Sequence, residues 1–273
     1  MRIAVTGAGG VLGTAVVDLA VHSGHTVVAL ERAIERDLAV QVPSDEWVSR
    51  HTVDLAEYDD LLPIVSGCDA LIHLAAYVQP GAAPEPLVHN NNVMASYNAL
   101  AAAQAADITR VCIASSVNAI GGRYSATPRY DYFPLDESHP CYAEDPYSLS
   151  KWLAEQQAAA FARRRPGMSI ACLRLHALRD RAFMAAHWAG RTEGGRLDLW
   201  GYTPISLAAT ACLSSLTADF DGAETFYVVA NDTPLEVNSQ DLRDRYYPTV
   251  PIRGDLPGNA AFFDSGKAER LLW

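Results

Sequence analysis

A tyrosine and a lysine stand four positions apart at the start of an expected helix. The segment DPYSLSKWLAEQ, residues 145–156, contains Tyr147 and Lys151, and Lys151 is one of only two lysines in the chain. Residues at i and i+4 share a helix face, so the phenol and the ammonium would lie side by side. Such a pair can perform acid–base chemistry, but the spacing alone is only suggestive, because it also arises by chance.

A second pattern with chemical meaning lies at the amino terminus. The run RIAVTGAGGVLGTAVVDLAVHSGHTVVALER is typical of a strand, a glycine turn, a helix and a second strand. Gly7, Gly10 and Gly13 give the spacing G-x-x-G-x-x-G. Glycine lets the backbone approach a pyrophosphate closely, and the N-terminus of the following helix presents free N–H groups to the anion. In this context the glycines predict a dinucleotide-binding loop.

The end of the second expected strand addresses the choice of dinucleotide. Glu31 follows the first glycine by 24 residues, where a carboxylate can accept the ribose hydroxyls of NAD and repel a 2′-phosphate. Its neighbour Arg32 can instead bind the phosphate of NADP. We expect NAD, with NADP as the open alternative. A surface pair of Glu31 and Arg32 without any cofactor role is the structural alternative.

The elements that must position these residues follow an alternating rhythm. Apolar, strand-like runs are separated by amphipathic stretches, which predicts β-α-β units and a parallel sheet buried on both faces. The fold class is therefore α/β, a Rossmann-type doubly wound sheet. Residues 1–175 would form the NAD(P)-binding core, and residues 176–273 a small substrate-binding lobe with the remaining core elements. The strand-like runs are residues 2–7, 25–31, 69–76, 110–116, 169–175 and 225–231.

Composition excludes several classes of function. A formal charge of −11 without any lysine-rich run argues against nucleic acid and anionic membranes as partners. The five cysteines show no C-x-x-C pair, and the histidines show no ligand spacing, so we expect no metal site and interpret His73 as a packed residue. MRIAVTG leads directly into a strand, and no apolar run approaches ~20 residues. We therefore expect a cytoplasmic protein.

Taken together, these motifs resemble the extended short-chain dehydrogenases/reductases, the NAD-dependent epimerase/dehydratase family. VTGAGGVLG resembles the family's phosphate loop, and VDL resembles the segment that contacts adenine. DALIHLAA resembles the family's fourth strand, and ASSVNAIGG resembles its serine motif. NVMASYN resembles the family's N-V-x-G-T-x-N helix, with Ala95 in place of glycine. The resemblance implies a catalytic set of Ser116, Tyr147 and Lys151. It implies cofactor contacts from Gly7, Gly10, Val11, Leu12, Gly13, Glu31, Arg32, Asp54, Leu55, Leu74, Ala75, Ala76, Asn92, Tyr147 and Lys151.

Those roles give the tyrosine–lysine pair a chemical meaning. A free tyrosine has a pKa near 10, and lowering it to about 7 requires roughly 4 kcal/mol of preferential stabilisation of the phenolate. A nearby ammonium and the positive nicotinamide ring would supply it in a partly dry site. Tyr147 would then be the general base toward a substrate hydroxyl, Ser116 would hydrogen-bond the same oxygen, and Lys151 would also hold the nicotinamide ribose.

The carboxyl-terminal part departs from the nucleotide-sugar enzymes of the family. The usual N-x-Y-G-P after the run ACLRLHALRD is missing, and the remaining lobe is short. The chain is more similar to the short uronate-dehydrogenase branch, which carries an arginine on the sixth strand. Arg174 would hold a substrate carboxylate bidentately or, equally, serve as a structural ion-pair partner. Tyr77 and Asn118 are further candidate substrate contacts, with Ser116.

The sequence thus predicts an NAD(P)-dependent oxidoreductase that oxidises a hydroxyl of a small polar substrate, such as a sugar or sugar acid. An epimerase or dehydratase that retains its NAD is the alternative within enzymes, and a non-catalytic dinucleotide sensor is the alternative of another class. Two alanine-rich helical stretches, residues 84–106 and 147–165, resemble those that pair across the two-fold axis of the family's dimers. We therefore expect a homodimer.

Overall fold

The structure, a computed structural model, describes residues 1–32 and 46–273. A seven-stranded sheet forms its centre, with the strand order β3-β2-β1-β4-β5-β6-β7 and parallel pairing between all neighbours. This arrangement confirms the predicted doubly wound fold. The strands are β1 (Arg2–Thr6), β2 (Thr26–Glu31), β3 (Val48–Thr52), β4 (Ala70–His73), β5 (Arg110–Ser116), β6 (Ser169–Leu175) and β7 (Gly222–Val228).

The apolar runs of the sequence account for six of these strands, and β3 is the exception. Its segment VSRHT carries little apolar alternation, and only Val48 is buried. β3 is the edge strand beside β2, so most of its side chains contact solvent. The family resemblance does imply a strand before residue 69, because it makes residues 69–76 the fourth strand of the sheet. The apolar pattern alone identifies only two strands in that part of the chain.

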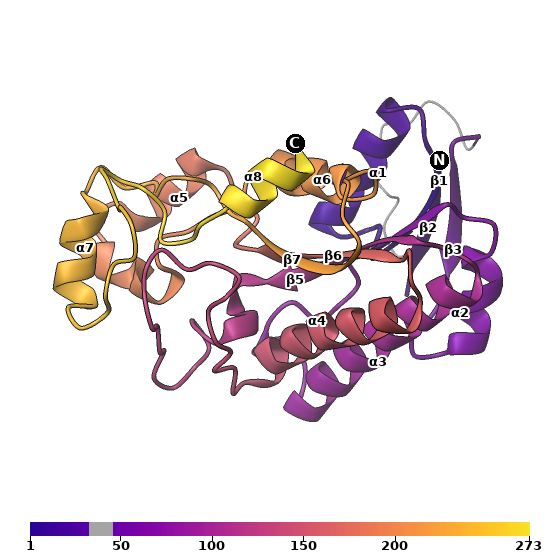
Figure 1. Cartoon of the computed structure of the whole chain (residues 1–273), viewed down its shortest axis with the longest axis horizontal. Helices are drawn as coiled ribbons and strands as arrows, with labels where there is room; N and C mark the ends of the chain where they lie inside the picture. Colours follow the sequence, from indigo (N-terminus) through magenta and orange to yellow (C-terminus); the bar gives the residue numbers. More distant parts are fainter. Residues whose placement is uncertain (33–45) are drawn as a thin grey trace.

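Helices cover both faces of the sheet (Figure 1). One face is covered by α1 (Val11–His22), α6 (Ile205–Ser214) and α8 (Gly266–Leu272), and the other by α2 (Tyr58–Val65), α3 (Glu85–Ala105) and α4 (Pro146–Arg164). A separate apolar core lies on each side. On the second face the alanine-rich α3 and α4 pack closely together, with Tyr97 edge-on to Phe161 at a centroid distance of 5.3 Å.

The chain after residue 175 contributes both to the sheet and to a lobe beyond the carboxyl ends of β5, β6 and β7 (Figure 1). The segments α6, β7 and α8 return to the sheet, whereas α5 (Arg181–Trp188), η3 (Thr192–Asp198) and α7 (Ser239–Tyr246) belong to the lobe. An aromatic core that includes Phe133, Trp200 and Phe262 joins the lobe to residues 117–135. The division at residue 175 stays a prediction.

The open edge of β7 is covered by side chains from other segments. The backbone N–H of Tyr227 donates to Glu137 Oε1 at 2.7 Å, and Lys267 Nζ donates to the carbonyl of Thr225 at 2.8 Å. These contacts occupy groups that would otherwise be free to pair with another strand. The free edge of β7 is thereby protected from pairing with a further strand.

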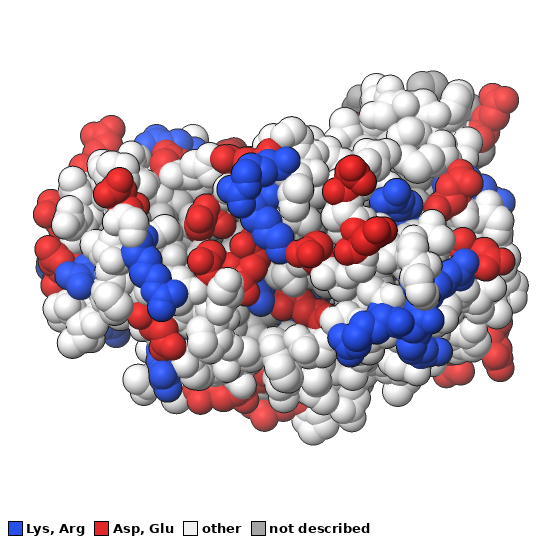
Figure 2. Space-filling view, in the orientation of Figure 1, with Lys and Arg blue, Asp and Glu red and all other residues white. Residues whose placement is uncertain are grey.

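The surface agrees with the acidic composition. Figure 2 shows basic side chains in small groups among acidic ones, without a broad basic surface on the face that it presents. Within the described residues, no helix combines the length and the apolar character needed to cross a lipid bilayer.

Candidate active site

The glycine turn between β1 and α1 packs directly against the end of β4. Gly7 has φ +68°, and a Cβ at this position would lie 2.8 Å from the backbone nitrogen of Ala75. A Cβ on Gly13 would lie 2.1 Å from the carbonyl oxygen of Gly7. Any side chain at either position would therefore displace the backbone. Helix α1 begins directly after this glycine turn, and the first N–H groups of the helix have no acceptor within it.

A cleft of about 430 Å³ opens beside the turn. Its walls come from the carboxyl ends of β1, β2 and β4, where open α/β sheets bind ligands. Nine of the predicted cofactor residues line it, whereas six do not, namely Val11, Leu12, Gly13, Asn92, Tyr147 and Lys151. The lining residues are Gly7, Gly9, Gly10, Leu30, Glu31, Arg32, Val53, Asp54, Leu55, Leu74, Ala75, Ala76, Tyr77, Val78, Asn91 and Ala95.

Glu31 is fixed at the wall of this cleft. Its Oε2 accepts the backbone N–H of Gly9 at 2.9 Å, and its Oε1 accepts the N–H of Arg32 at 3.1 Å. The guanidinium of Arg32 lies 5.5 Å from the ring centroid of Tyr77 and donates to the Tyr77 hydroxyl at 3.3 Å. That hydrogen bond raises the pKa of Arg32. The cleft thus combines a glycine backbone suited to pyrophosphate with a carboxylate suited to ribose hydroxyls, and it fits NAD.

Asn92 does not line the cleft but holds Tyr77, which does. It is buried on α3, accepts the N–H of Tyr77 at 2.8 Å and donates to the carbonyl of Tyr77 at 3.0 Å. Its amide also donates to Ser150 on α4 at 3.1 Å. Asn92 therefore ties the segment after β4 to the helix that carries Tyr147.

The three predicted catalytic residues meet at the carboxyl end of β5. Ser116 ends that strand, and α4 begins at a capped N-terminus where Asp145 Oδ1 accepts the N–H of Tyr147 at 3.0 Å. The cap fixes the first turn of the helix and hence the position of the phenol. Lys151 Nζ donates to the carbonyl of Ala114 at 2.7 Å and lies 5.8 Å from the centroid of the Tyr147 ring.

Burial governs the protonation of this set. It raises the pKa of Tyr147 to about 12, although a hydrogen bond with Ser116 acts in the opposite direction. Burial also lowers the pKa of Lys151 to about 8. Without further positive charge the phenol therefore stays protonated at neutral pH, while Lys151 remains mostly charged.

On the lobe side, Tyr124 stands edge-on to Tyr147 at a centroid distance of 5.9 Å. Asn118 accepts the N–H of Arg123 at 3.1 Å, which fixes the turn after η2 (Val117–Ile120). Arg123 forms an ion pair with Asp198 of η3 and so connects this turn to the lobe. Sequence reasoning did not single out Tyr124, and no feature of its local sequence marks it as a neighbour of Tyr147.

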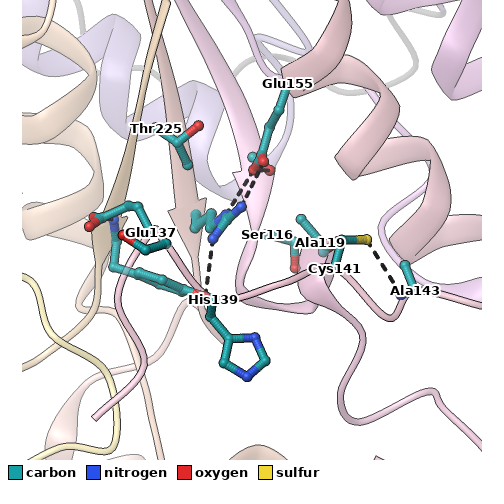
Figure 3. Close-up of polar contacts among 12 residues, drawn as sticks. Ser116, Ala119, Glu137, His139, Cys141, Ala143, Glu155 and Thr225 are labelled. Carbon is teal, nitrogen blue, oxygen red and sulfur yellow. Dashed lines mark hydrogen bonds and ion pairs between the residues drawn. The ribbon is translucent and has the colours of Figure 1, made fainter. Parts of the chain in front are cut away.

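Arg174 does not face an open binding site. Its Nε and Nη2 donate to the two carboxylate oxygens of Glu155 at 2.9 and 2.8 Å, and Figure 3 shows these parallel contacts. Its Nη1 donates to the Tyr227 hydroxyl at 3.3 Å, and the residue is only 5% exposed. This geometry favours the ion-pair alternative over a bidentate grip on a substrate carboxylate, because Glu155 already occupies the fork.

His73 is a packed residue, as the sequence indicated. Its Nδ1 lies 2.9 Å from Thr6 Oγ1, and that oxygen already accepts the N–H groups of Leu74 and Ala75. The Thr6 hydroxyl must therefore donate to His73, which identifies Nδ1 as the unprotonated nitrogen. Burial lowers the pKa of His73 to about 3, so this side chain is neutral.

Comparison with known proteins agrees with this architecture. The profile of the NAD dependent epimerase/dehydratase family matches residues 3–178. The chain belongs to this family. It is therefore an enzyme of the epimerase and dehydrogenase type with NAD as its cofactor, and the family assignment leaves the reaction open. The finer resemblance to the uronate-dehydrogenase branch has no specific support from the family profile.

Individual relatives carry several activities. The chain is 31% identical to a 2-alkyl-3-oxoalkanoate reductase from Stenotrophomonas maltophilia over 86% of its own length and 72% of the relative's. It is 31% identical to an L-arabinose 1-dehydrogenase (NAD(P)(+)) from Haloferax volcanii, over 64% of this chain and 66% of that one. Other relatives are matched over 43% to 61% of their own lengths.

Solved structures show the same fold at lower identity. A UDP-glucose 4-epimerase from Thermotoga maritima, solved with UDP-glucose, superposes with a TM-score of 0.72 at 17% identity. The match covers 100% of this chain and 92% of that one. The lobe beyond the sheet is thus part of the shared architecture.

Proposed function

We propose that this protein is an NAD-dependent dehydrogenase that oxidises a hydroxyl of a small polar substrate, such as a sugar or a sugar acid. One observation carries the proposal. The phenol of Tyr147, the hydroxyl of Ser116 and the ammonium of Lys151 converge at the carboxyl end of β5, next to a cleft that fits NAD. A protein that only sensed the dinucleotide would need no such base.

In the proposed mechanism, Tyr147 removes the proton of the substrate hydroxyl, and Ser116 donates a hydrogen bond to the same oxygen as negative charge develops on it. When bound, NAD would supply the hydride acceptor. Lys151 stabilises the phenolate and, by the family resemblance, would hold the nicotinamide ribose. The proton leaves the substrate toward the phenolate oxygen, one helical turn from the ammonium.

The electrostatic requirement can be worked from the structure. Lowering the pKa of Tyr147 from about 12 to about 7 needs roughly 7 kcal/mol. The pKa of about 12 is already that of the phenol with the ammonium of Lys151 in place, 5.8 Å from the ring centroid, so Lys151 alone does not supply this free energy. A second positive charge is required, and the oxidised nicotinamide ring would bring it. The base is therefore active only in the cofactor complex.

The substrate class rests on the lobe. Asn118, Tyr124 and Ser116 lie on the lobe side of the catalytic tyrosine, whereas Tyr77 lines the dinucleotide cleft. The relative named an L-arabinose 1-dehydrogenase shares 31% identity, and a monosaccharide or its acid would suit a short lobe. Among the family's branches we propose that the uronate dehydrogenases are nearest, with Asn118 and Ser116 as substrate contacts.

We also propose a homodimer formed through α3 and α4. Leu87, Met94 and Tyr97 project from α3 with 49%, 46% and 47% of their surfaces exposed. Their spacings of seven and three residues place them along one side of the helix. An exposed apolar stripe of this kind, beside the alanine-rich packing of α3 on α4, suits a second copy of the chain.

The test of the proposed reaction is a screen of the purified protein with NAD against neutral sugars and sugar acids. Growth of the near-ultraviolet absorbance of NADH, absent in Tyr147→Phe, is the expected result. Conversion of a sugar into its epimer with tightly bound NAD and no net NADH would favour the epimerase alternative. Binding of NAD without conversion of any substrate would favour a sensor.

A further inference from the structure

Three charged side chains are buried together behind the catalytic tyrosine. Lys151, Glu155 and Arg174 are 8%, 6% and 5% exposed. Arg174 binds both oxygens of Glu155 (Figure 3). The Ser115 hydroxyl also donates to Oε1 of Glu155 at 2.6 Å. The carboxylate of Glu155 is thus held by three donors from β5 and β6.

Glu155 follows Lys151 by four residues on α4, so the two side chains share one face of the helix. At this spacing a lysine and a glutamate commonly form an ion pair. In the described part of the chain, Lys151 and Glu155 do not form an ion pair with each other. Lys151 donates to the carbonyl of Ala114 on β5, and Glu155 is bound by Arg174 on β6.

The three charges are close enough to influence one another. The thiol of Cys172 on β6 responds to all three: burial raises its pKa, Glu155 raises it further, and Arg174 and Lys151 lower it. Glu155 also acts to raise the pKa of Lys151, against the larger effect of burial. A buried carboxylate without a cation is costly, so Glu155 without Arg174 would turn to the ammonium one turn away.

We propose that Arg174 is a positioning residue of the catalytic centre that, by binding both oxygens of Glu155, keeps this carboxylate from pairing with Lys151. The ammonium then stays on the Ala114 carbonyl and remains available to Tyr147. An ion pair between Lys151 and Glu155 would neutralise the charge that the phenolate needs. This consequence for catalysis rests on the proposed function, whereas the arrangement of the three charges does not.

Among residues 1–32 and 46–273, Glu155 is the one carboxylate that acts on Lys151. His73 on β4 faces Lys151 but is neutral, because burial lowers its pKa to about 3. Asp145 at the start of α4 acts on Tyr147. The remaining titratable neighbours, from every element packed against the centre, are Tyr124, Glu137, His139, Cys141, Cys172 and Tyr227.

The experiment is a direct titration of Lys151 in the protein without cofactor or substrate. Because the chain contains only Lys151 and Lys267, labelling with lysine enriched in carbon-13 at Cε gives two NMR signals, and Lys267→Arg assigns them. Lys267 lies on α8, bound to Glu224 and the carbonyl of Thr225, and serves as an internal reference. The titration is repeated in Arg174→Met, in Glu155→Gln and in the double variant.

Opposite shifts are expected in the single variants. Arg174→Met should raise the pKa of Lys151 by about two units, because the guanidinium charge is lost and Glu155 is freed toward the ammonium, whereas Glu155→Gln should lower it by only about one unit. The double variant should return to within about half a unit of the unmodified protein, because the pair removed is neutral. The Lys267 signal should move less than that of Lys151 in all of them, because Lys267 is bound to Glu224 and reaches Arg174 only through Glu137.

A purely structural ion pair gives an additive pattern, in which the shifts of the two single variants sum to that of the double variant because only the through-space effects of the two charges are lost, and that result would overturn the proposal. Shifts of the same sign in both single variants would overturn it too. If Arg174→Met fails to fold, Arg174→Gln, which also removes the charge, takes its place in the same comparison, and additive shifts there contradict the proposal. Because no substrate is needed, the outcome is independent of which reaction the enzyme performs.

Discussion

Replacing Glu31 should redirect the enzyme from NAD toward NADP. The Glu31 carboxylate is fixed by the N–H groups of Gly9 and Arg32, so it is preorganised to accept the ribose hydroxyls of NAD. A charge-assisted hydrogen bond of this type contributes about 1.5–3 kcal/mol, and Glu31→Ala should weaken NAD binding by roughly 10- to 150-fold.

The same substitution removes a repulsion. Two like charges ~4 Å apart interact with about 4 kcal/mol at an effective dielectric constant of 20, and we halve this value because the cleft is open to solvent. Without the acidic neighbour Glu31, the guanidinium of Arg32 can bind the 2′-phosphate of NADP. Together the two effects should change the ratio of NAD to NADP affinity by about three orders of magnitude.

Isothermal titration calorimetry with both dinucleotides measures this ratio. Glu31→Gln separates the effects, because the amide still accepts the N–H of Gly9 but carries no charge. Asp219→Ala, which removes an acidic side chain exposed at the opposite edge of the sheet, is the matched control and should leave the ratio unchanged. The interpretation fails if Glu31→Gln leaves the ratio unchanged, or if the unmodified protein binds NADP about tenfold more tightly than NAD.

Three further outcomes are expected. Tyr147→Phe should lower kcat by about 10²- to 10⁴-fold with NAD affinity and melting temperature nearly unchanged, and activity within tenfold of the original would contradict its role as base. Light scattering should give a dimer of the chain, which Met94→Glu converts to monomers; a monomeric unmodified protein would refute the interface. Unfolded His73 has an ordinary pKa of 6.5 and folded His73 one of about 3, so the unfolded state takes up the proton as pH falls. The free energy of unfolding should therefore decrease as the pH falls from about 6.5 to about 3. An equally steep decrease in His73→Gln would show that other groups cause it.

The sheet was largely predictable because its strands are buried on both faces. Parallel central strands such as β4, with the burial of every residue from Ala70 to His73, appear in the sequence as uninterrupted apolar runs. The edge strand β3 contacts solvent, so neither apolar pattern nor alternation marks it. The positions of the six other strands along the chain were accessible, but the contacts across the sheet depend on register, which the sequence does not display.

The cofactor cleft was predictable to a similar extent. Glycines and the acidic residue after β2 have backbone and charge requirements that the local sequence reveals, and Gly7 and Glu31 do line the cleft. Asn92 was predicted as a cofactor contact, but it faces inward on α3 and holds Tyr77. Motifs identify positions along the chain, whereas the direction of a side chain follows from packing between α3 and α4.

Glu155, which we propose to act next to the catalytic centre, was not predicted from the sequence. Tyr147, Lys151 and Glu155 follow one another at intervals of four, so the helix that presents the base and its ammonium also presents a carboxylate on the same face. Arg174 lies in an apolar strand and requires a buried partner, yet many acidic residues in the chain were candidates. The register of β5 and β6 resolves the choice, because it pairs Ser115 with Arg174 directly beneath α4. A carboxylate one turn from a catalytic lysine would quench it unless a neighbouring strand supplies a second cation, and the pairing of β5 with β6 puts that cation in place.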